Sequence, residues 1–405
     1  MNGLSDSYDV VIAGGGPAGA SAAIHLAGRG ARVLLAEQKK FPRAKLCGEF
    51  ISPECLEHFA RLGVAERMTT AGGVGLTETR FYTRGGESVG VPSEWFGASH
   101  ALALGLSRAE MDARLLVRAR EVGVEVLEET QAVGVLIVGG RVCGLRLKTG
   151  DEVRVFDSLM AIDATGRNCA LARRVEASRR ENHARHKRAS LVAFKAHLEG
   201  ARGAQGHCEI YFYRGGYGGL NSVEGGRSNL CFIASARDVR ECGSDAERVM
   251  REVLMMNKRA AYTLARARVE TEWLGVALES FGRRRLVPAD GLITVGDAAS
   301  FIDPFTGSGM LMALESGELA GEVVARWLAQ LRDGDSLAAL ATDYRARYDE
   351  KFRARLRVCA LMRRAAFVPR LAEATIHLLG KSERARRTLA RATRTVKIAT
   401  TDEHG

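Results

Sequence analysis

The sequence lacks the patterns that mark metal-binding, disulfide-rich and membrane-spanning proteins. Its eight cysteines contain no C-x-x-C pair and follow no regular spacing, so neither structural zinc nor a disulfide framework is indicated. Its longest apolar runs fall short of the roughly 18 residues that a membrane span requires. The N-terminus has no apolar signal-peptide core. We therefore expect a cytoplasmic protein without a metal site.

Motifs of several other protein classes are missing as well. There is no G-x-S-x-G elbow and no Walker loop, which leaves hydrolase and kinase functions without support. The net charge of +11 is concentrated in residues 341–405, where 16 Lys and Arg residues accompany seven Asp and Glu residues. Because neither interleaved aromatic residues nor zinc-finger spacing accompanies this charge, we expect no nucleic-acid partner.

What the sequence does have is a nucleotide-binding pattern over residues 8–37. A β-branched apolar run leads directly into the spacing G-x-G-x-x-G and then into a helix with a small apolar face. A second strand ends at an acidic residue, which can accept hydrogen bonds from a ribose. The glycines allow close approach to a pyrophosphate, and the helix N-terminus offers free N–H groups. The expected contacts are Gly14, Gly16, Pro17, Ala18, Gly19, Glu37 and Gln38.

The loop at 41–53 has an unusual composition for a connection. Arg43 and Lys45 can meet phosphate oxygens, and Cys47 beside Gly48 combines a thiol with a flexible backbone. The same composition also fits a basic loop with a buried thiol.

A capping box formed by Ser107 and Glu110 predicts a helix with Arg108 in its first turn. A cation in that position opposes the helix dipole, so contact with a bound phosphate or ribose is the alternative to a solvent-exposed arginine. Alternating residues over 123–155 then predict a β-meander.

Two more strands end in ligand-binding signatures. The strand at 159–162 is followed by Asp163 and Gly166, and the strand at 292–295 by Gly296 and Asp297. In α/β sheets such strand ends are where ligands bind. The turn after the second strand opens a long helix that is expected to run to about residue 331, and it contains Pro304, Phe305, Gly307, Ser308, Gly309 and Met310. Between these signatures, residues 189–234 read as strands of a second sheet, and a helix is expected from 245 to about 267.

Together these motifs resemble the FAD-dependent oxidoreductases with the para-hydroxybenzoate hydroxylase fold. The resemblance covers roughly residues 8–330 and implies non-covalent FAD. It implies that the glycine turn holds the pyrophosphate, that Glu37 binds the adenosine ribose, that Gly296 and Asp297 bind the ribityl chain, and that the turn at 307–310 lies along the isoalloxazine. Arg108 matches the helix arginine near the cofactor, and Asp163 with Gly166 matches the middle aspartate-glycine motif, with two residues inserted.

The resemblance also implies an α/β fold with a discontinuous domain plan. We expect a Rossmann-like FAD-binding domain with an inserted β-meander from 1–80, 101–180 and 281–335. A smaller α+β substrate domain takes 81–100 and 181–280, and residues 336–405 form a basic helical C-terminal region.

Within this group the Pro-x-x-Lys-x-Cys-Gly loop resembles that of the geranylgeranyl reductases, which makes Cys47 and Lys45 catalytic candidates beside the flavin. The substrate half departs from those reductases, because the stretch after Tyr217 has neither their tryptophan nor their proline. Flavin halogenases also resemble the cofactor half, but their Trp-x-Trp-x-Ile-Pro segment is missing.

Besides a flavin-dependent halogenase, which stays a second alternative, two enzymatic functions follow, with a third outside catalysis. The favoured one is an NAD(P)H-dependent monooxygenase that hydroxylates an aromatic or apolar substrate, lipid-like or polyketide, in a dry cavity. The alternative is reduction of C=C bonds in a polyprenyl or other lipophilic substrate, with Cys47 assisting protonation. A non-catalytic lipid carrier is the third. The expected cavity walls are Pro304, Phe305, Phe194, Tyr211, Tyr213 and Tyr217.

The basic C-terminal region, 344–397, is expected to be helical, with apolar residues interleaved among arginines. It is either a helical cap on the flavin domain or a surface for peripheral contact with an anionic membrane, which would suit a lipophilic substrate.

Overall fold

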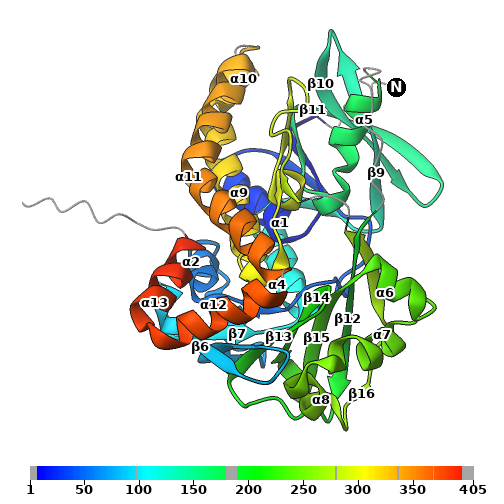
Figure 1. Ribbon diagram of the computed structural model, residues 1–405. Helices are drawn as coiled ribbons and strands as arrows, with labels where there is room; N and C mark the ends of the chain where they lie inside the picture. The colour runs from blue at the N-terminus through cyan, green and yellow to red at the C-terminus, as the bar shows by residue number, and fades with distance from the viewer. Residues whose placement is uncertain are drawn as a thin grey trace, which may run out of the picture.

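The computed structural model describes residues 7–96, 99–178, 189–278, 281–334, 337–367 and 369–394. Two sheets occupy opposite ends of the molecule, and the C-terminal helices run along one side between them (Figure 1). The α/β architecture with a helical C-terminal region confirms the predicted fold class. Residues 395–397 of the predicted helical region lie outside the described part of the chain.

The first sheet carries the nucleotide-binding pattern. Its strands follow the order β8 (Glu125–Leu127), β2 (Val33–Ala36), β1 (Ser7–Ala13), β11 (Glu152–Asp163), β10 (Arg141–Thr149) and β9 (Thr130–Val138), and β19 (Leu292–Thr294) also pairs with β11. Strands β2, β1, β11 and β19 are parallel, so their carboxyl ends meet at one edge. That edge receives the predicted glycine turn, Glu37, Asp163 and Gly296.

The predicted meander and the strand at 159–162 are one feature rather than two. Strand β11 runs unbroken over 12 residues, pairing antiparallel with β10 in its first half and parallel with β1 in its second. Its burial changes accordingly, because the first half is exposed and the end is buried within the sheet. β11 therefore joins the inserted meander to the parallel core.

Helices cover the first sheet, packed through small residues. They are α1 (Pro17–Ala27), α2 (Pro53–Arg61), α3 (Ala65–Thr69), α4 (Arg108–Glu121), α5 (Ala170–Ser178), α9 (Gly309–Arg326) and α10 (Leu328–Arg332). The single helix predicted from 309 to about 331 is interrupted at Trp327. Helices α1 and α9 lie against each other where Gly317 and Gly321 leave no room for a side chain.

The second sheet follows the order β16 (Arg268–Val269), β12 (Leu191–Glu199), β15 (Ser228–Ser235), β14 (Gly216–Ser222), β13 (His207–Tyr213), β5 (Glu78–Tyr82) and β6 (Ser88–Pro92), and β17 (Leu274–Leu278) also pairs with β12. Its outer face is covered by α6 (Ala236–Glu241), α7 (Ala246–Glu252) and α8 (Lys258–Leu264). The helix predicted from 245 to 267 breaks at Asn257, whose side-chain oxygen caps α8 while its amide donates to Phe212 O.

Short pairings and three helices complete the fold. A small sheet contains β3 (Phe50–Ile51), β7 (Ala103–Gly105) and β4 (Val74–Leu76), and β18 (Gly282–Arg283) pairs with β20 (Ser300–Phe301). The C-terminal helices are α11 (Leu337–Ala366), α12 (Pro369–Lys381) and α13 (Glu383–Ala392), drawn orange to red in Figure 1. α11 packs on α9, whereas α12 contacts β6 and β13 of the second sheet. None of the helices in the described ranges is long and apolar enough to cross a membrane.

Candidate functional site

A continuous cavity of about 690 Å³ runs from the edge of the first sheet, past the inner face of the second, to the C-terminal helices. Most of the residues predicted from the sequence line it. These are Gly14, Gly16, Pro17, Ala18, Glu37, Gln38, Arg43, Lys45, Cys47, Gly48, Arg108, Gly166, Tyr217, Gly296, Asp297, Pro304, Phe305, Gly307, Gly309 and Met310. The site is thus built from six separate stretches of sequence, 14–18, 37–48, 108, 166, 217 and 296–310, which the fold brings together.

The β1–α1 turn forms a tight backbone cradle at one end. Gly14 has φ +108°, and a Cβ on Gly14 would overlap the carbonyl oxygen of Ala164. A Cβ on Gly19 would overlap the carbonyl oxygen of Gly14. Gly19 therefore lies behind the turn and allows close packing of the helix. The first amides of α1 have no acceptor within the helix, and the positive end of the helix dipole faces the cavity.

Two arginines converge on this cradle. Guanidinium nitrogens of Arg108 and Arg43 lie 3.7 and 3.8 Å from the position that a Cβ on Gly16 would take. Both are held by Asp112, which accepts from Arg108 Nε and Nη2 at 2.9 and 2.7 Å and from Arg43 Nη1 at 3.1 Å. Burial lowers the pKa of Arg108, but the charge and hydrogen bonds of Asp112 outweigh it and raise that pKa overall. Arg108 therefore stays charged in a buried position.

Glu37 occupies the predicted ribose position at the end of β2. Its Oε2 accepts from the Gly15 amide at 2.9 Å, and its Oε1 accepts from the Lys39 amide at 3.0 Å. These bonds fix the carboxylate beside the glycine turn, where it lines the cavity together with Gln38.

Asp163 and Ser308 support the cavity from behind its wall. The fully buried Asp163 carboxylate accepts from the amides of Thr165, Leu171 and Ala172 at 3.0, 3.0 and 2.9 Å. It thereby holds the turn containing Gly166 and the start of α5. The Ser308 hydroxyl donates to Thr393 O at 3.3 Å, so it joins α9 to the end of the C-terminal helices.

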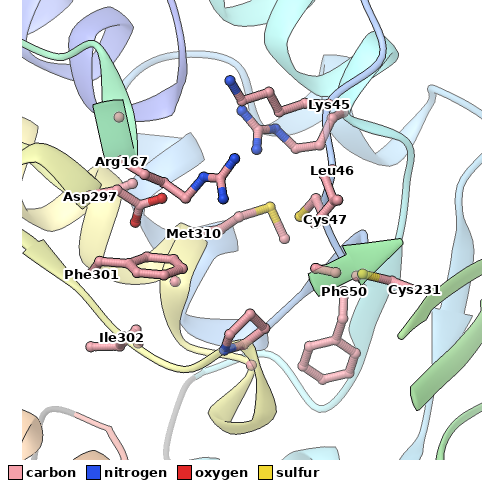
Figure 2. A pocket seen from close by; sticks show the side chains of 18 of the residues that line it. Lys45, Leu46, Cys47, Phe50, Arg167, Cys231, Asp297, Phe301, Ile302 and Met310 are labelled. Carbon is pink, nitrogen blue, oxygen red and sulfur yellow. The ribbon is translucent and has the colours of Figure 1, made fainter. Parts of the chain in front are cut away.

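The middle of the cavity carries charged and sulfur-containing side chains (Figure 2). There Arg167 and Asp297 approach from one side, Lys45 and Cys47 from the other, and Met310 lies between them. Burial raises the pKa of Asp297, a change that Arg167, Arg108 and Lys45 oppose. Burial also lowers the pKa of Lys45, with the neighbouring cations Arg43 and Arg108 acting in the same direction.

The Cys47 thiol is enclosed within this region. Burial raises its pKa, although the charge of Arg108 and a hydrogen bond from the Glu49 amide at 3.4 Å lower it in part. The thiol is therefore protonated at neutral pH. A protonated thiol in an apolar wall is a proton donor rather than a nucleophile.

The prediction that Phe194, Tyr211 and Tyr213 wall the cavity is wrong. These rings belong to the buried cluster between the second sheet and helices α6–α8, on the face away from the cavity. Successive side chains of a strand point to opposite faces, so their neighbours line the cavity instead. Those neighbours are Ala193, Ile210 and Phe212.

Tyr217, Phe305 and Phe212 do meet at the cavity, with ring centroids 5.4 to 5.5 Å from Phe305. The Tyr217 hydroxyl donates to Asp303, which also accepts from Arg363 Nε of α11 at 3.1 Å. Residues of α12 and α13, including Ile376, Leu379 and Ala390, close the far end. The substrate end is thus apolar and aromatic.

Several site residues were not predicted from the sequence. Arg167 directly follows the predicted turn at Gly166, so the sequence does contain a signal for it: a cation next to an acidic residue at a strand end. Asp303 directly precedes the predicted Pro304, so its position also gives a local signal. By contrast Lys195 and His197 lie in an alternating strand, and their link to Glu49 spans 146 and 148 residues, which no local pattern reveals.

The donor set fits FAD. A glycine cradle that a Cβ would fill, the N-terminus of α1 and two arginines suit a pyrophosphate. A carboxylate at the end of β2 suits a ribose, and the space between Met310 and Cys47 suits an aromatic ring system. The fold and this donor set define a dinucleotide-binding flavoprotein.

Known proteins agree with that class. Residues 7–347 match the family described as FAD binding domain. Digeranylgeranylglycerophospholipid reductase 2 of Methanopyrus kandleri is 28% identical over 361 residues, covering 85% of this chain and 83% of the relative. Menaquinone reductase of Mycolicibacterium smegmatis is 27% identical over 342 residues, covering 79% of this chain and 77% of that relative. A flavin-dependent brominase of known structure shares the fold, with a TM-score of 0.79 at 22% identity. The match covers 96% of this chain and 93% of the brominase chain.

The chain belongs to this FAD-binding family and is an FAD-dependent oxidoreductase of the para-hydroxybenzoate hydroxylase fold.

Proposed function

We propose that this enzyme reduces carbon–carbon double bonds of a polyprenyl or other lipophilic substrate, with NAD(P)H as the electron donor. The observation that carries the proposal is the protonated Cys47 thiol in the wall of an apolar cavity that is continuous with the nucleotide-binding cradle. The names of the relatives reported above, two reductases, support the same reaction type.

Saturating a C=C bond adds one hydride and one proton. Bound FAD, once reduced, supplies the hydride, and the protein contributes orientation, exclusion of water and the proton. In the proposal the Cys47 S–H bond breaks, its proton forms the second C–H bond, and Arg108 stabilises the thiolate that remains. The apolar residues of α12 and α13 exclude water from this step.

Anaerobic reoxidation tests the proposal. The protein is loaded with FAD, reduced without air and mixed with a geranylgeranyl lipid, and the flavin absorbance and the product mass are followed. We expect reoxidation and a product two hydrogens heavier. Cys47→Ala should slow product formation about a hundredfold or more while leaving FAD bound. Absence of reoxidation without dioxygen would refute the reductase function.

Hydroxylation is the second candidate, favoured by one observation. The rings of Phe305, Phe212, Tyr217 and Phe81 form an aromatic wall, in which the Phe305 and Phe81 centroids are 5.7 Å apart, and such a wall suits an aromatic substrate. Isotopically labelled dioxygen distinguishes the two reactions. Oxygen incorporated into an aromatic product, with no anaerobic turnover of the prenyl lipid, would favour the monooxygenase.

We also propose that the outer side of the C-terminal helices contacts an anionic membrane peripherally. Leu361 on α11 and Leu378 on α12 are 64% and 66% exposed; Arg363 and Arg364 follow Leu361 closely, and Lys381 follows Leu378. Replacing both with Asp should weaken cosedimentation with anionic liposomes about tenfold or more. The control is Tyr262→Asp on α8, an exposed apolar residue (55%) that lies outside the C-terminal helices. Equal binding of both variants would disprove the contact.

A further inference from the structure

Three titratable side chains meet behind Cys47 in nearly complete burial. Glu49 Oε1 accepts from Lys195 Nζ at 2.8 Å, and the other carboxylate oxygen lies 2.6 Å from His197 Nε2. The exposed fractions of Glu49, Lys195 and His197 are 0%, 2% and 7%. Glu49 belongs to the loop before β3, whereas Lys195 and His197 share one face of β12, so the cluster joins the two sheets. The reaction proposed above does not use it.

The backbone around Glu49 is held in a demanding conformation. Its φ of +52° is in the left-handed region, which is strained for a residue with a Cβ. The surrounding structure fixes it there, because the Glu49 carbonyl accepts from Asn221 Nδ2 at 3.2 Å and from the Leu106 amide at 3.3 Å. The left-handed turn directs the Glu49 amide back toward Cys47 Sγ, 3.4 Å away.

The second sheet also holds Cys47 directly. Asn229 Nδ2 on β15 donates to the Cys47 carbonyl at 3.2 Å. Glu49 Oε1 accepts in addition from the Arg108 amide at 2.9 Å, which ties the same carboxylate to the start of α4. Residues 47–49 are therefore fixed by three strands of one sheet and one helix of the other layer.

The charge of Glu49 is maintained in this position. Burial raises its pKa, but the hydrogen bonds and charges of His197 and Lys195 outweigh burial and lower it overall. A carboxylate consequently lies beside the thiol at neutral pH. Replacing it with a neutral group would leave Lys195 buried without its counter-ion.

We propose that Glu49 is a positioning residue for Cys47, held by Lys195 and His197 so that the thiol faces the cavity and its reactivity is set by the neighbouring carboxylate. This inference rests on the proposed function only for the role of the thiol. Its own content, the control of Cys47 by Glu49, can be measured without substrate.

The groups facing the sulfur determine the sign of the effect. Arg108 from α4 and the Glu49 amide favour the thiolate, whereas the Glu49 carboxylate opposes it. Cys231 from β15 and Lys45 from the same loop also line this part of the cavity. Glu49→Gln keeps the amide and removes the charge, so the thiolate becomes easier to form.

The experiment follows alkylation of Cys47 by iodoacetamide in the FAD-loaded protein over a range of pH, with the modified peptide quantified by mass spectrometry. We expect Glu49→Gln to lower the midpoint of the plot of Cys47 alkylation rate against pH by about one pH unit. Below that midpoint, the alkylation rate should rise about tenfold. Cys143 on β10 serves as the internal reference. An alkylation curve that coincides with that of the wild type would overturn the proposal.

Glu209→Gln is the matched control. Glu209 is also fully buried in the second sheet, and it pairs with Arg259. It lies on the same face of β13 as Tyr211, which faces away from the cavity. It should lower stability without moving the Cys47 curve, and an equal shift in both variants would show a merely structural effect.

If Glu49→Gln does not fold, the double variant Glu49→Gln with Lys195→Met removes both charges together. A smaller shift in the same direction is then expected, because loss of the Lys195 cation partly offsets loss of the Glu49 charge, which lies nearer the sulfur. No shift in that variant would contradict the proposal. A shifted curve combined with normal turnover of Cys47→Ala would leave the positioning intact and remove only the proton-donor role.

Discussion

A single carboxylate, Asp112, lets two arginines remain beside the pyrophosphate cradle. It is fully buried and accepts hydrogen bonds from both Arg43 and Arg108. Asp112→Asn would leave two cations with one neutral acceptor, and breaking a buried pair in this way costs about 3–5 kcal/mol. We expect FAD affinity to fall by about a hundredfold or more, as measured by quenching of flavin fluorescence on titration.

The control for that substitution lies two residues away on the same helix. Glu110 pairs with Arg114 at the surface of α4, where such pairs contribute between about 0 and 1 kcal/mol. Glu110→Gln should therefore leave FAD affinity within about threefold of the wild type. Equal losses in the two variants would mean that Asp112 acts on the helix and not on the arginines.

The same scale shows what the sequence can predict. Residues around the cradle were identified because their chemistry depends on spacing along the chain, as in the glycine turn. The face on which Phe194 lies cannot be predicted, since alternation shows that a strand has two faces and not which of them meets the cavity. Glu49 gives no local signal, because its partners lie on a strand far away in sequence.

At the scale of elements, the close packing of α1 on α9 fixes the position of the N-terminus of α1 at the cradle. A Cβ on Gly317 would overlap the Ala18 carbonyl oxygen and approach Ser21 Cβ to 2.9 Å. Gly317→Ala should therefore push the helices apart, with a loss of about 1–3 kcal/mol in the free energy of unfolding and weaker FAD binding. Urea unfolding and flavin titration measure the two effects.

Gly380 on α12 is the comparison, because a Cβ there would meet no atom within 4 Å. Gly380→Ala should be neutral or stabilising by up to about 1 kcal/mol. If Gly317→Ala behaved in the same way, close packing of α1 on α9 would not be a constraint on the fold.

The same helix pair gives the molecule a pH dependence. Burial lowers the pKa of His25 on α1 to about 4, against the opposing charge of Glu318 on α9. An unfolded histidine titrates near 6.5, so between pH 6.5 and about 4 only the unfolded chain binds this proton and stability falls as the pH falls.

His25→Gln should remove up to about 3 kcal/mol of that acid-induced loss. Urea unfolding at pH 7 and near pH 4.5 would show a smaller difference in the variant than in the wild type. Parallel losses would place the acid sensitivity in other groups.

Element boundaries were harder to predict than element types. The 245–267 helix and the 309–331 helix each break at a residue with tertiary contacts, Asn257 and Trp327, whose indole donates to Asp343 at 3.1 Å. Periodicity within the segment does not register such contacts, because the partner is supplied by another element.

At the scale of the whole molecule, three layers close around one cavity and Asp303 contacts all of them. It lies in the flavin-side loop before Pro304, it accepts from Tyr217 of the second sheet, and it accepts from Arg363 of α11. The Arg363 guanidinium also lies 3.7 Å from the centroid of the Phe281 ring. Since α12 and α13 follow α11, this contact fixes the C-terminal helices over the substrate end.

Removing Arg363 should loosen that cover without disturbing the cradle. Arg363→Met removes the ion pair between α11 and the buried Asp303. We therefore expect iodide to quench the flavin fluorescence about twofold or more faster, and amides of α12 to exchange about tenfold faster. FAD affinity should not change, because the cradle contacts lie at the other end of the cavity. Arg364→Met, one residue along the same helix and exposed, is the control. Of these two arginines Arg363 is the one that donates to Asp303, so identical quenching in the two variants would mean that the C-terminal helices do not depend on this contact.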